Sequence, residues 1–207
     1  KILGYFLFTL CSFLAKFFHQ VTAIDIDQDA ITYAKNKFKR KNLVFKVGDA
    51  MNLEFSNNSF DVVICTQVYE HVPNSKKLFK EIYRVLKPDG ICYLAAINRL
   101  WPWEPHYNLP LLSWLPPKAA NFYARLFRGQ NYYESTLSYW GLKKLLPNYK
   151  IYDLTQKILS NSKKYGYSED FPKSRFVLKL IAIGSPILRY FTPTFILILK
   201  KKSTQAA

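Results

Sequence analysis

The sequence feature that most constrains the fold is a mostly apolar run that ends abruptly in acidic residues. Residues 21–24 read Val-Thr-Ala-Ile, Asp25 and Asp27 follow, and residues 28–38 have the composition of a helix. This pattern predicts a buried strand followed by a helix. In open α/β sheets ligands bind beyond the carboxyl ends of the strands, where a carboxylate typically binds the hydroxyl groups of a nucleotide ribose. An acid at this place can equally cap the next helix, so both interpretations stay open for Asp25 and Asp27.

The same pattern occurs a second time. Residues 43–47 (Leu-Val-Phe-Lys-Val) are followed by Gly48-Asp49-Ala50, and a third strand-like run covers residues 60–65. Strands that alternate with helices predict βαβ units and a parallel sheet, in which the strand ends line one edge. The sequence therefore predicts an α/β fold over residues 20–97, within a single domain of 207 residues.

Periodicity and turn signals predict the remaining elements. We expect helices over residues 9–18, 74–86 and 137–146, with Ser135 or Thr136 capping the last of these, and strands over residues 91–97, 150–159 and 192–199. Lys87-Pro88-Asp89-Gly90 is predicted to be the turn that closes the second helix.

The net charge of +16 is unevenly distributed. Residues 97–207 carry 17 Lys and Arg against 5 Asp and Glu, which accounts for +12 of it. Such a basic face implies an anionic partner, either a phospholipid surface, a nucleic acid or a phosphorylated substrate, although a solvated surface explains it equally well. The three cysteines are odd in number and lack metal-type spacing, so we expect buried thiols in the reducing cytoplasm.

The apolar run over residues 2–15 is similar in composition to a signal peptide. It is too short to span a bilayer and leads into the strand at residue 21 without a small-residue cleavage site. We therefore expect it to be part of the fold, and the lack of an initial Met suggests that upstream residues are missing.

With these elements in place, the chain resembles the class I, Rossmann-like methyltransferases that use S-adenosylmethionine. The resemblance covers residues 14–97 and rests on five stretches: Val21–Asp25, Gly48–Ala50, Ser59–Ile64, Glu70-His71-Val72-Pro73 and Glu81–Gly90. The last two are most similar to the branch that methylates small molecules, including quinone precursors. The resemblance implies a mostly parallel sheet with helices on both faces, an antiparallel last strand and a lid insertion after the fifth strand.

The resemblance also implies a set of cofactor-binding residues. Asp25 would hold the ribose hydroxyls of S-adenosylmethionine, Ile26 would pack on the adenine, and Asp49 would accept a hydrogen bond from the adenine amino group. The other implied contacts are Ala50 and Met51 beside the ring, and Thr66 and Gln67 near the methionine moiety and the transferable methyl group.

The glycine-rich loop of the family is incomplete here. Its Gly-x-Gly-x-Gly pattern falls on residues 4–8, where Gly4 is retained but Phe6 and Phe8 occupy the other glycine positions. Glycine lets the backbone approach the cofactor closely. Either the two aromatic residues replace the glycines, or residues around the loop are missing from this chain.

Residues 98–134 interrupt the alternation of strands and helices with a segment rich in Trp, Tyr and Pro. In this family an insertion here often forms a lid over the acceptor, and a long functional loop fits that role. An aromatic plug over an exposed sheet end explains the composition equally well. The candidate substrate-binding residues are His71, Trp103, His106 and Tyr107.

Methyl transfer requires no particular catalytic residue, because the cofactor carries the activated methyl group and the protein aligns the nucleophile. If the acceptor is a hydroxyl group, His71 or His106 can act as a base, although we favour His71 as a residue at the start of a helix, satisfied by backbone. Glu70 and His71 are adjacent, but two ligands without a third make no site, so no metal is predicted.

A basic, amphipathic insertion is predicted over residues 160–191. Its charges argue against a transmembrane span; it would lie on an anionic membrane or pack against the domain with solvated lysines. Together these features predict a cytoplasmic methyltransferase for a small-molecule or lipid-linked acceptor. The alternatives are an RNA methyltransferase and an inactive membrane-surface module. Against RNA, residues 65–68 (Cys-Thr-Gln-Val) lack the Asn/Asp-Pro-Pro-Tyr motif of enzymes that methylate exocyclic base amines.

Overall fold

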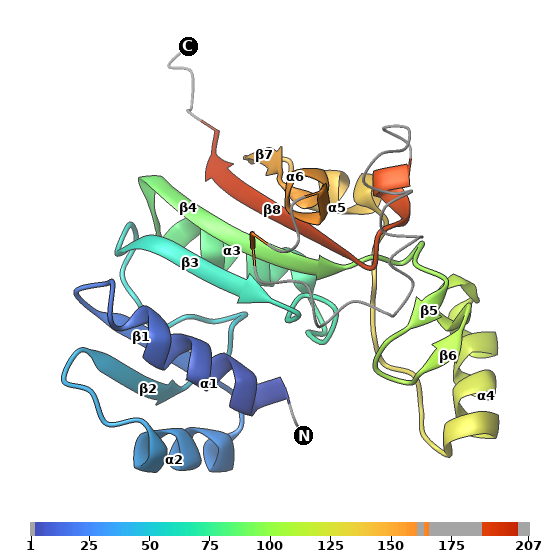
Figure 1. Ribbon diagram of the computed structural model, residues 1–207, viewed down its shortest axis with the longest axis horizontal. Coiled ribbons are helices and arrows are strands. Elements are labelled where there is room, and N and C mark those ends of the chain that lie inside the picture. Colours follow the sequence, from blue (N-terminus) through green and yellow to red (C-terminus); the bar gives the residue numbers. More distant parts are fainter. Residues whose placement is uncertain (1–2, 161–163, 166–187, 203–207) are drawn as a thin grey trace. The chain divides into compact units, whose positions relative to one another are not determined.

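The computed structural model describes residues 3–160, 164–165 and 188–202. The chain divides into two compact units, Lys1–Ser56 and Asn57–Ala207. Among the described residues, every pair of hydrogen-bonded strands lies within one unit (Figure 1).

The first unit is built on two parallel strands, β1 (Val21–Asp25) and β2 (Leu43–Val47). Helix α2 (Gln28–Lys37) connects them, and helix α1 (Leu3–Leu14) precedes β1. The buried residues of this unit are Phe8, Ala15, Ala23, Ile31, Ala34, Leu43 and Phe45. Ile31 and Ala34 lie three residues apart on α2, which is the spacing that puts two side chains on one helix face.

Helix α1 begins earlier than the sequence indicated. We expected a helix from residue 9 and a counterpart of the glycine loop at residues 4–8, but Leu3–Leu14 form one continuous helix. This stretch contains no proline, and Gly4, its one glycine, lies in the first turn, so nothing interrupts the helix. Phe8 is buried and meets Phe45 of β2 edge to face, with ring centroids 5.4 Å apart. Residues 4–8 are thus helical and do not form a glycine-rich loop.

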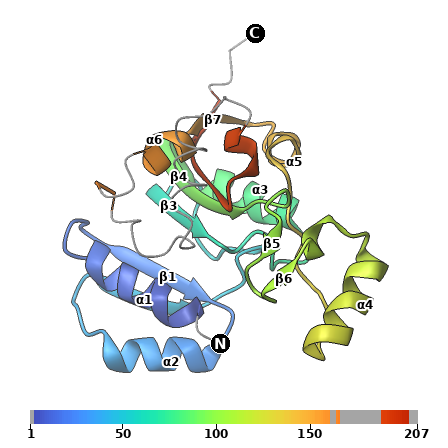
Figure 2. The ribbon, with the colours of Figure 1, turned by 45° about the vertical axis from the view of Figure 1, so that its right-hand side comes forward.

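The second unit contains a four-stranded sheet in the order β3-β4-β8-β7. Its strands are β3 (Phe60–Thr66), β4 (Leu86–Ile97), β8 (Thr194–Lys201) and β7 (Tyr149–Asp153). Strands β3 and β4 are parallel, while β8 is antiparallel to both of its neighbours. Helices α3 (Ser75–Val85) and α5 (Tyr139–Leu145) lie on one face of this sheet and α6 (Thr155–Ser160) on the other (Figures 1 and 2). The predicted α/β fold with an antiparallel last strand is confirmed.

Strand β4 begins sooner than expected. Leu86 pairs with Phe60 and Ile91 pairs with Val62, so residues 87–90, predicted as a turn, form an irregular part of the strand. A Cβ atom at Gly90 would lie 3.0 Å from the carbonyl oxygen of Asp61. The glycine therefore allows a close approach of two backbones that another residue would obstruct.

Two boundaries near the end of the chain also differ from expectation. The cap of α5 is Ser138, which accepts a hydrogen bond from the N–H of Gly141, and not Ser135 or Thr136. Residues 155–159, predicted as part of a strand, belong to α6 (Thr155–Ser160). The carboxylate of Asp153 accepts from the N–H of Thr155 at 2.9 Å, which ends β7 and starts the helix.

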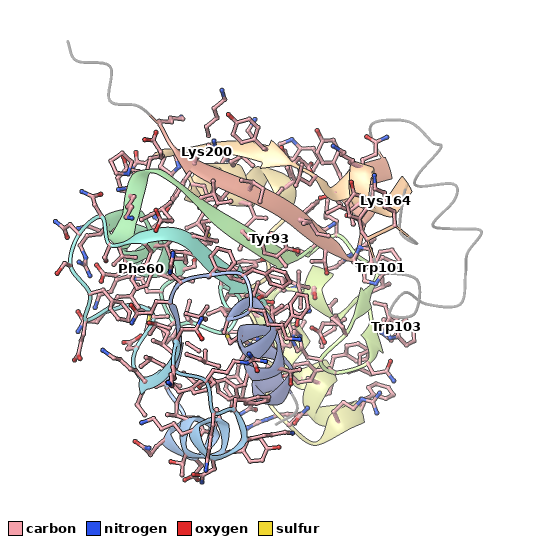
Figure 3. The ribbon with its side chains drawn as sticks, turned by 60° about the vertical axis from the view of Figure 1, so that its left-hand side comes forward. Phe60, Tyr93, Trp101, Trp103, Lys164 and Lys200 are labelled. Carbon is pink, nitrogen blue, oxygen red and sulfur yellow. The ribbon has the colours of Figure 1, made fainter. Side chains whose placement is uncertain are left out.

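The predicted lid segment lies at the carboxyl ends of β3 and β4 (Figure 1). It contains the short strands β5 (Trp103–Glu104) and β6 (Leu109–Pro110), the 3-10 helix η1 (Leu112–Trp114) and helix α4 (Pro117–Arg128). Trp101 lies shortly before β5, and Trp103 is the first residue of β5 (Figure 3). The buried cluster of this segment comprises Tyr107, Leu109, Leu112, Ala120 and Ala124.

The predicted basic insertion over residues 160–191 lies mostly outside the described residues, which include only Lys164, Tyr165 and the 3-10 helix η2 (Leu188–Phe191) of its central and final parts. In the part of the chain that the structure describes, no helix combines the length and the apolarity needed to cross a membrane.

Asn98 ties the end of β4 to the segment before β8. Its side chain is buried, its Nδ2 donates to the carbonyls of Tyr190 and Thr192 at 2.7 and 2.8 Å, and its Oδ1 accepts from the N–H of Leu100. We expect Asn98→Ala to lower the free energy of unfolding by about 2 kcal/mol or more, because buried hydrogen-bonding groups lose their partners. Urea denaturation followed by circular dichroism measures this. Asn36→Ala, on the exposed face of α2, should change it by less than about 0.5 kcal/mol. Equal effects of the two substitutions would contradict the assignment.

Candidate functional site

Two predicted cofactor-binding acids lie at the same edge of the β1–β2 sheet. Asp25 is paired with Val47, and the N–H of Gly48 donates to the carbonyl oxygen of Asp25 at 3.0 Å, so Asp49 follows directly beyond that pair. Each carboxylate accepts one local backbone N–H: Asp25 from Asp27 at 3.0 Å and Asp49 from Met51 at 2.8 Å. These bonds orient the two carboxylates at the carboxyl ends of parallel strands, where ligands bind in this class of sheet.

The structure also separates the two interpretations of Asp25 and Asp27. Asp27 is the N-cap of α2, because its Oδ1 accepts from the N–H groups of Asp29 and Ala30 at 2.8 and 3.2 Å. Asp25 is not the cap. Ile26 lies between the two acids and is 75% exposed, which is unusual for a large apolar side chain next to a sheet. Ala50 and Met51 are half-buried in the turn after Asp49.

Thr66 and Gln67 lie at the end of β3, in the second unit. Gln67 has a φ of 52°, and its N–H donates to the carbonyl of Ala95 at 2.9 Å. The hydroxyl of Thr66 is buried without a hydrogen-bond partner among the described residues. Left-handed backbone at a residue other than glycine costs energy and is often found at functional sites. The cofactor contacts of Thr66 and Gln67, and that of Gly4, stay predictions.

The second unit brings two of the predicted substrate-binding residues together. His71 follows β3, and His106 lies between β5 and β6; their rings meet edge to face with centroids 4.8 Å apart. Nδ1 of His106 is 2.9 Å from Oε1 of Glu104, and Nδ1 of His71 is 3.8 Å from Oε1 of Glu134. These four residues and the neighbouring Glu70 are called the Glu-His cluster below; its members are Glu70, His71, Glu104, His106 and Glu134.

Glu70 is the most unusual member of the Glu-His cluster. It is 0% exposed, and neither carboxylate oxygen has a hydrogen-bond partner among the described residues. One of its oxygens and one ring nitrogen each of His71 and His106 all lie within 4.8 Å of one another. Such a set of groups can bind a divalent cation or share protons.

Burial and mutual charge shift the pKa values in the Glu-His cluster. Burial raises the pKa of Glu70 to about 7. Burial, followed by repulsion from His106, lowers the pKa of His71. For His106 burial also opposes the charge, but the hydrogen bond with Glu104 and the attraction of nearby carboxylates outweigh it, so the pKa is raised.

The other two predicted substrate residues have different surroundings. Tyr107 is 6% exposed, and its hydroxyl donates to the carbonyl of Asn131 at 2.6 Å, so it helps to hold the lid segment together. Trp103 is about half exposed, and its indole N–H donates to Asn108 at 2.6 Å. Their contacts with a substrate stay predictions.

Sequence reasoning missed Glu104 and Glu134. The Glu-Pro-His order of residues 104–106 gives a weak signal for the first, because side chains two apart across a turn can meet. Nothing near Glu134 in the sequence indicates its position beside His71.

Comparisons with known proteins relate part of the chain to a known family. Residues 8–94, fewer than half of the 207 residues, match the family described as methyltransferase domain. This part of the chain is therefore similar to a methyltransferase domain. S-adenosylmethionine is the cofactor that this similarity implies. The matched residues include two members of the Glu-His cluster, Glu70 and His71. They also include four predicted cofactor-binding residues, Asp25, Asp49, Thr66 and Gln67.

Two curated relatives of the methyltransferase domain act on lipid-like molecules according to their names. The demethylmenaquinone methyltransferase of Listeria welshimeri is 31% identical over 133 residues, which are 60% of this chain and 55% of the relative. The phthiotriol/phenolphthiotriol dimycocerosates methyltransferase of Mycobacterium tuberculosis is 31% identical over 123 residues, which are 57% and 45%. The chain thus spans about half the length of these relatives.

A solved structure supports the fold of the methyltransferase domain. An S-adenosylmethionine-dependent methyltransferase from Methanosarcina mazei matches with a TM-score of 0.53 and 19% identity, covering 88% of this chain and 82% of that one. At this identity the likeness concerns the fold alone.

The buried carboxylate of Glu70 leads to a stability prediction. A pKa raised from its ordinary value of 4.5 to about 7 means that the native state favours the protonated acid. The native state therefore loses stability as the pH rises from about 4.5 to about 7, and the loss is complete above that range. In the presence of EDTA, we expect Glu70→Gln to raise the free energy of unfolding at pH 8 on the order of 2 kcal/mol, and to change it little at pH 4. Urea denaturation at both pH values measures this; a variant less stable than wild type at pH 8 would contradict it.

Proposed function

We propose that this chain transfers the methyl group of S-adenosylmethionine to a lipid-linked acceptor, with residues 98–134 serving as a lid over that acceptor. The placement of Asp25 and Asp49 at one sheet edge is the observation that supports cofactor binding most strongly. The names of the curated relatives and the surface of the lid segment support the acceptor class.

The residues at this edge fit the cofactor. Asp25 is oriented by a backbone N–H and is not used as a helix cap, so its carboxylate suits the two ribose hydroxyls. Asp49, two residues beyond the strand, suits the amino group of adenine. The exposed side chain of Ile26 offers an apolar surface to the flat ring. The bound cofactor supplies a methyl group on a positively charged sulfur, and the protein holds it in line with the acceptor atom.

Helix α4 of the lid segment has an unusual distribution of side chains. Its buried positions are the small residues Ala120 and Ala124. Phe122, Leu126 and Phe127 are 69%, 64% and 59% exposed. Phe122 and Leu126 are one turn apart and share a face. An exposed apolar face on a helix that also carries Lys118, Arg125 and Arg128 suits a hydrocarbon chain or an anionic lipid surface.

The cofactor half of the proposal is tested by comparing Asp25→Ala with Asp27→Ala in calorimetric titrations of S-adenosylhomocysteine. We expect Asp25→Ala to weaken binding about tenfold or more, because hydrogen bonds to a charged group are lost. Asp27→Ala should lower the free energy of unfolding by about 1 kcal/mol through the lost cap, while binding stays within about threefold.

Unchanged binding by Asp25→Ala would contradict its role. Loss of binding in both variants with equal loss of stability would show that the edge acts only as a folded scaffold.

The acceptor half is tested with demethylmenaquinones that differ in the length of their isoprenoid tail. The double substitution Phe122→Ser/Leu126→Ser should raise the KM for the long-tailed acceptor about tenfold or more and leave the tail-less one unaffected, because two exposed apolar contacts are lost. Phe17→Ser is the matched control, since Phe17 is also 69% exposed but lies in the first unit. An unchanged KM for the long-tailed acceptor in the double variant, or an equal rise in the KM of both acceptors, would contradict the role of α4.

A further inference from the structure

The Glu-His cluster contains a buried carboxyl group without a hydrogen-bond partner among the described residues. Glu70 is 0% exposed, and both of its carboxylate oxygens lack hydrogen bonds to the described residues. Burying a carboxylate is unfavourable unless it is paired or coordinates a metal. One of its oxygens lies within 4.8 Å of one ring nitrogen each of His71, which is exposed, and His106, which is half-buried. A carboxylate and two imidazoles that converge in this way are the donor set of a metal site.

The distances suit a shared ion. The donor atoms of Glu70, His71 and His106 lie within 4.8 Å of one another. Three donors that each bind one ion at about 2.1 Å lie about 3.4 to 3.6 Å apart. Closing the cluster around an ion therefore needs a contraction of up to about 1.4 Å, which side-chain rotation can supply.

One further carboxylate orients His106 through a hydrogen bond, and a second lies near His71. Nδ1 of His106 bonds to Glu104, which leaves Nε2 for an ion, and Nδ1 of His71 is 3.8 Å from Glu134. Glu104 is itself buried and fixed by the N–H of Tyr107 at 2.6 Å. A carboxylate bonded to the second ring nitrogen is the usual support of a metal-binding histidine, because it fixes the ring and raises its basicity.

The charge of the surroundings strengthens the argument. Residues 97–207 contain only five acids against 17 Lys and Arg, yet two of the five, Glu104 and Glu134, lie beside the histidines. Neither makes an ion pair with a Lys or Arg among the described residues. A general base needs one histidine and one carboxylate, whereas three carboxylates around two imidazoles provide more negative charge than that role uses and can stabilise an added cation.

We propose that Glu70, His71 and His106 bind a divalent ion of the first transition row, with Glu104 and Glu134 as supporting residues. Two imidazoles favour manganese, iron, cobalt, nickel or zinc over calcium and magnesium, which prefer oxygen ligands. Three protein ligands leave at least one position on the ion open. If the proposed methyl transfer holds, this position would take an oxygen atom of the acceptor, because the cluster lies at the carboxyl end of β3 and within the lid segment.

The test uses the full chain without an affinity tag, stripped with EDTA and dialysed. Titration with Co²⁺, followed by its visible absorption, and calorimetry with Zn²⁺ should each show one ion per chain. Glu70→Gln and His106→Gln should each weaken binding about 100-fold or more, while Glu104→Gln should weaken it 10- to 100-fold, the usual effect of a supporting residue. His19→Gln is the matched control, because His19 is the remaining histidine of the chain and is exposed in the first unit. This substitution should leave metal binding unchanged.

Three results would overturn the metal site. These are no binding of either ion at 1 mM by folded wild-type protein, equal affinity in wild type and both ligand variants, and loss of binding in His19→Gln. Circular dichroism of each variant shows whether it folds. Misfolding explains the loss of metal binding only if both ligand variants, Glu70→Gln and His106→Gln, are unfolded. S-adenosylhomocysteine binding, measured in the same samples, separates this proposal from the cofactor proposal: metal binding without cofactor binding would contradict only the latter.

Discussion

Parallel strand pairing is the constraint on which the functional assignment depends. Strands that run in the same direction end at the same edge, so residues that follow them in the sequence gather there. In the first unit this places Asp49 at the same sheet edge as Asp25, although 23 residues lie between them in the sequence. In the second unit the parallel pair β3 and β4 does the same for His71 and the lid segment that contains His106. Neither set of residues needs a specific mutual contact to come together, because the parallel direction of the strands places both ends at one edge of the sheet.

The β1–β2 edge and the Glu-His cluster differ in how well their carboxylates are hydrogen-bonded. At the β1–β2 edge the carboxylates are half-buried and each is satisfied in part by one backbone N–H. In the Glu-His cluster Glu70 is fully buried without a hydrogen bond to the described residues, and its pKa is raised to about 7 by that burial. A protein with a net charge of +16 has many Lys and Arg side chains to place beside such a group, yet none among the described residues forms an ion pair with it. The arrangement is costly for stability, which favours a functional explanation.

Much of the fold was predictable from the sequence because local signals set it. Strand β2 matches its predicted bounds, and β1 and β3 match to within two residues, because turn residues flank each apolar run. Helix α1 was harder, since an almost unbroken apolar run has no periodicity to mark its start. The N-cap role of Asp27 could not be separated from that of Asp25 without the backbone geometry. The contact of His71 with His106, 35 residues apart in the sequence, and the position of Glu134 depend on tertiary structure and had no local signal.

Methyl transfer to a lipid-linked acceptor is the central claim, and the fate of the methyl group tests it most directly. The purified chain would be incubated with S-adenosylmethionine that carries a radioactive methyl group, together with a bacterial lipid extract and, separately, total RNA. The account predicts label in the organic phase of the lipid reaction, on a molecule that migrates with quinones or other neutral lipids. Label in RNA alone, with none in any lipid fraction, would contradict the account and favour the RNA methyltransferase alternative.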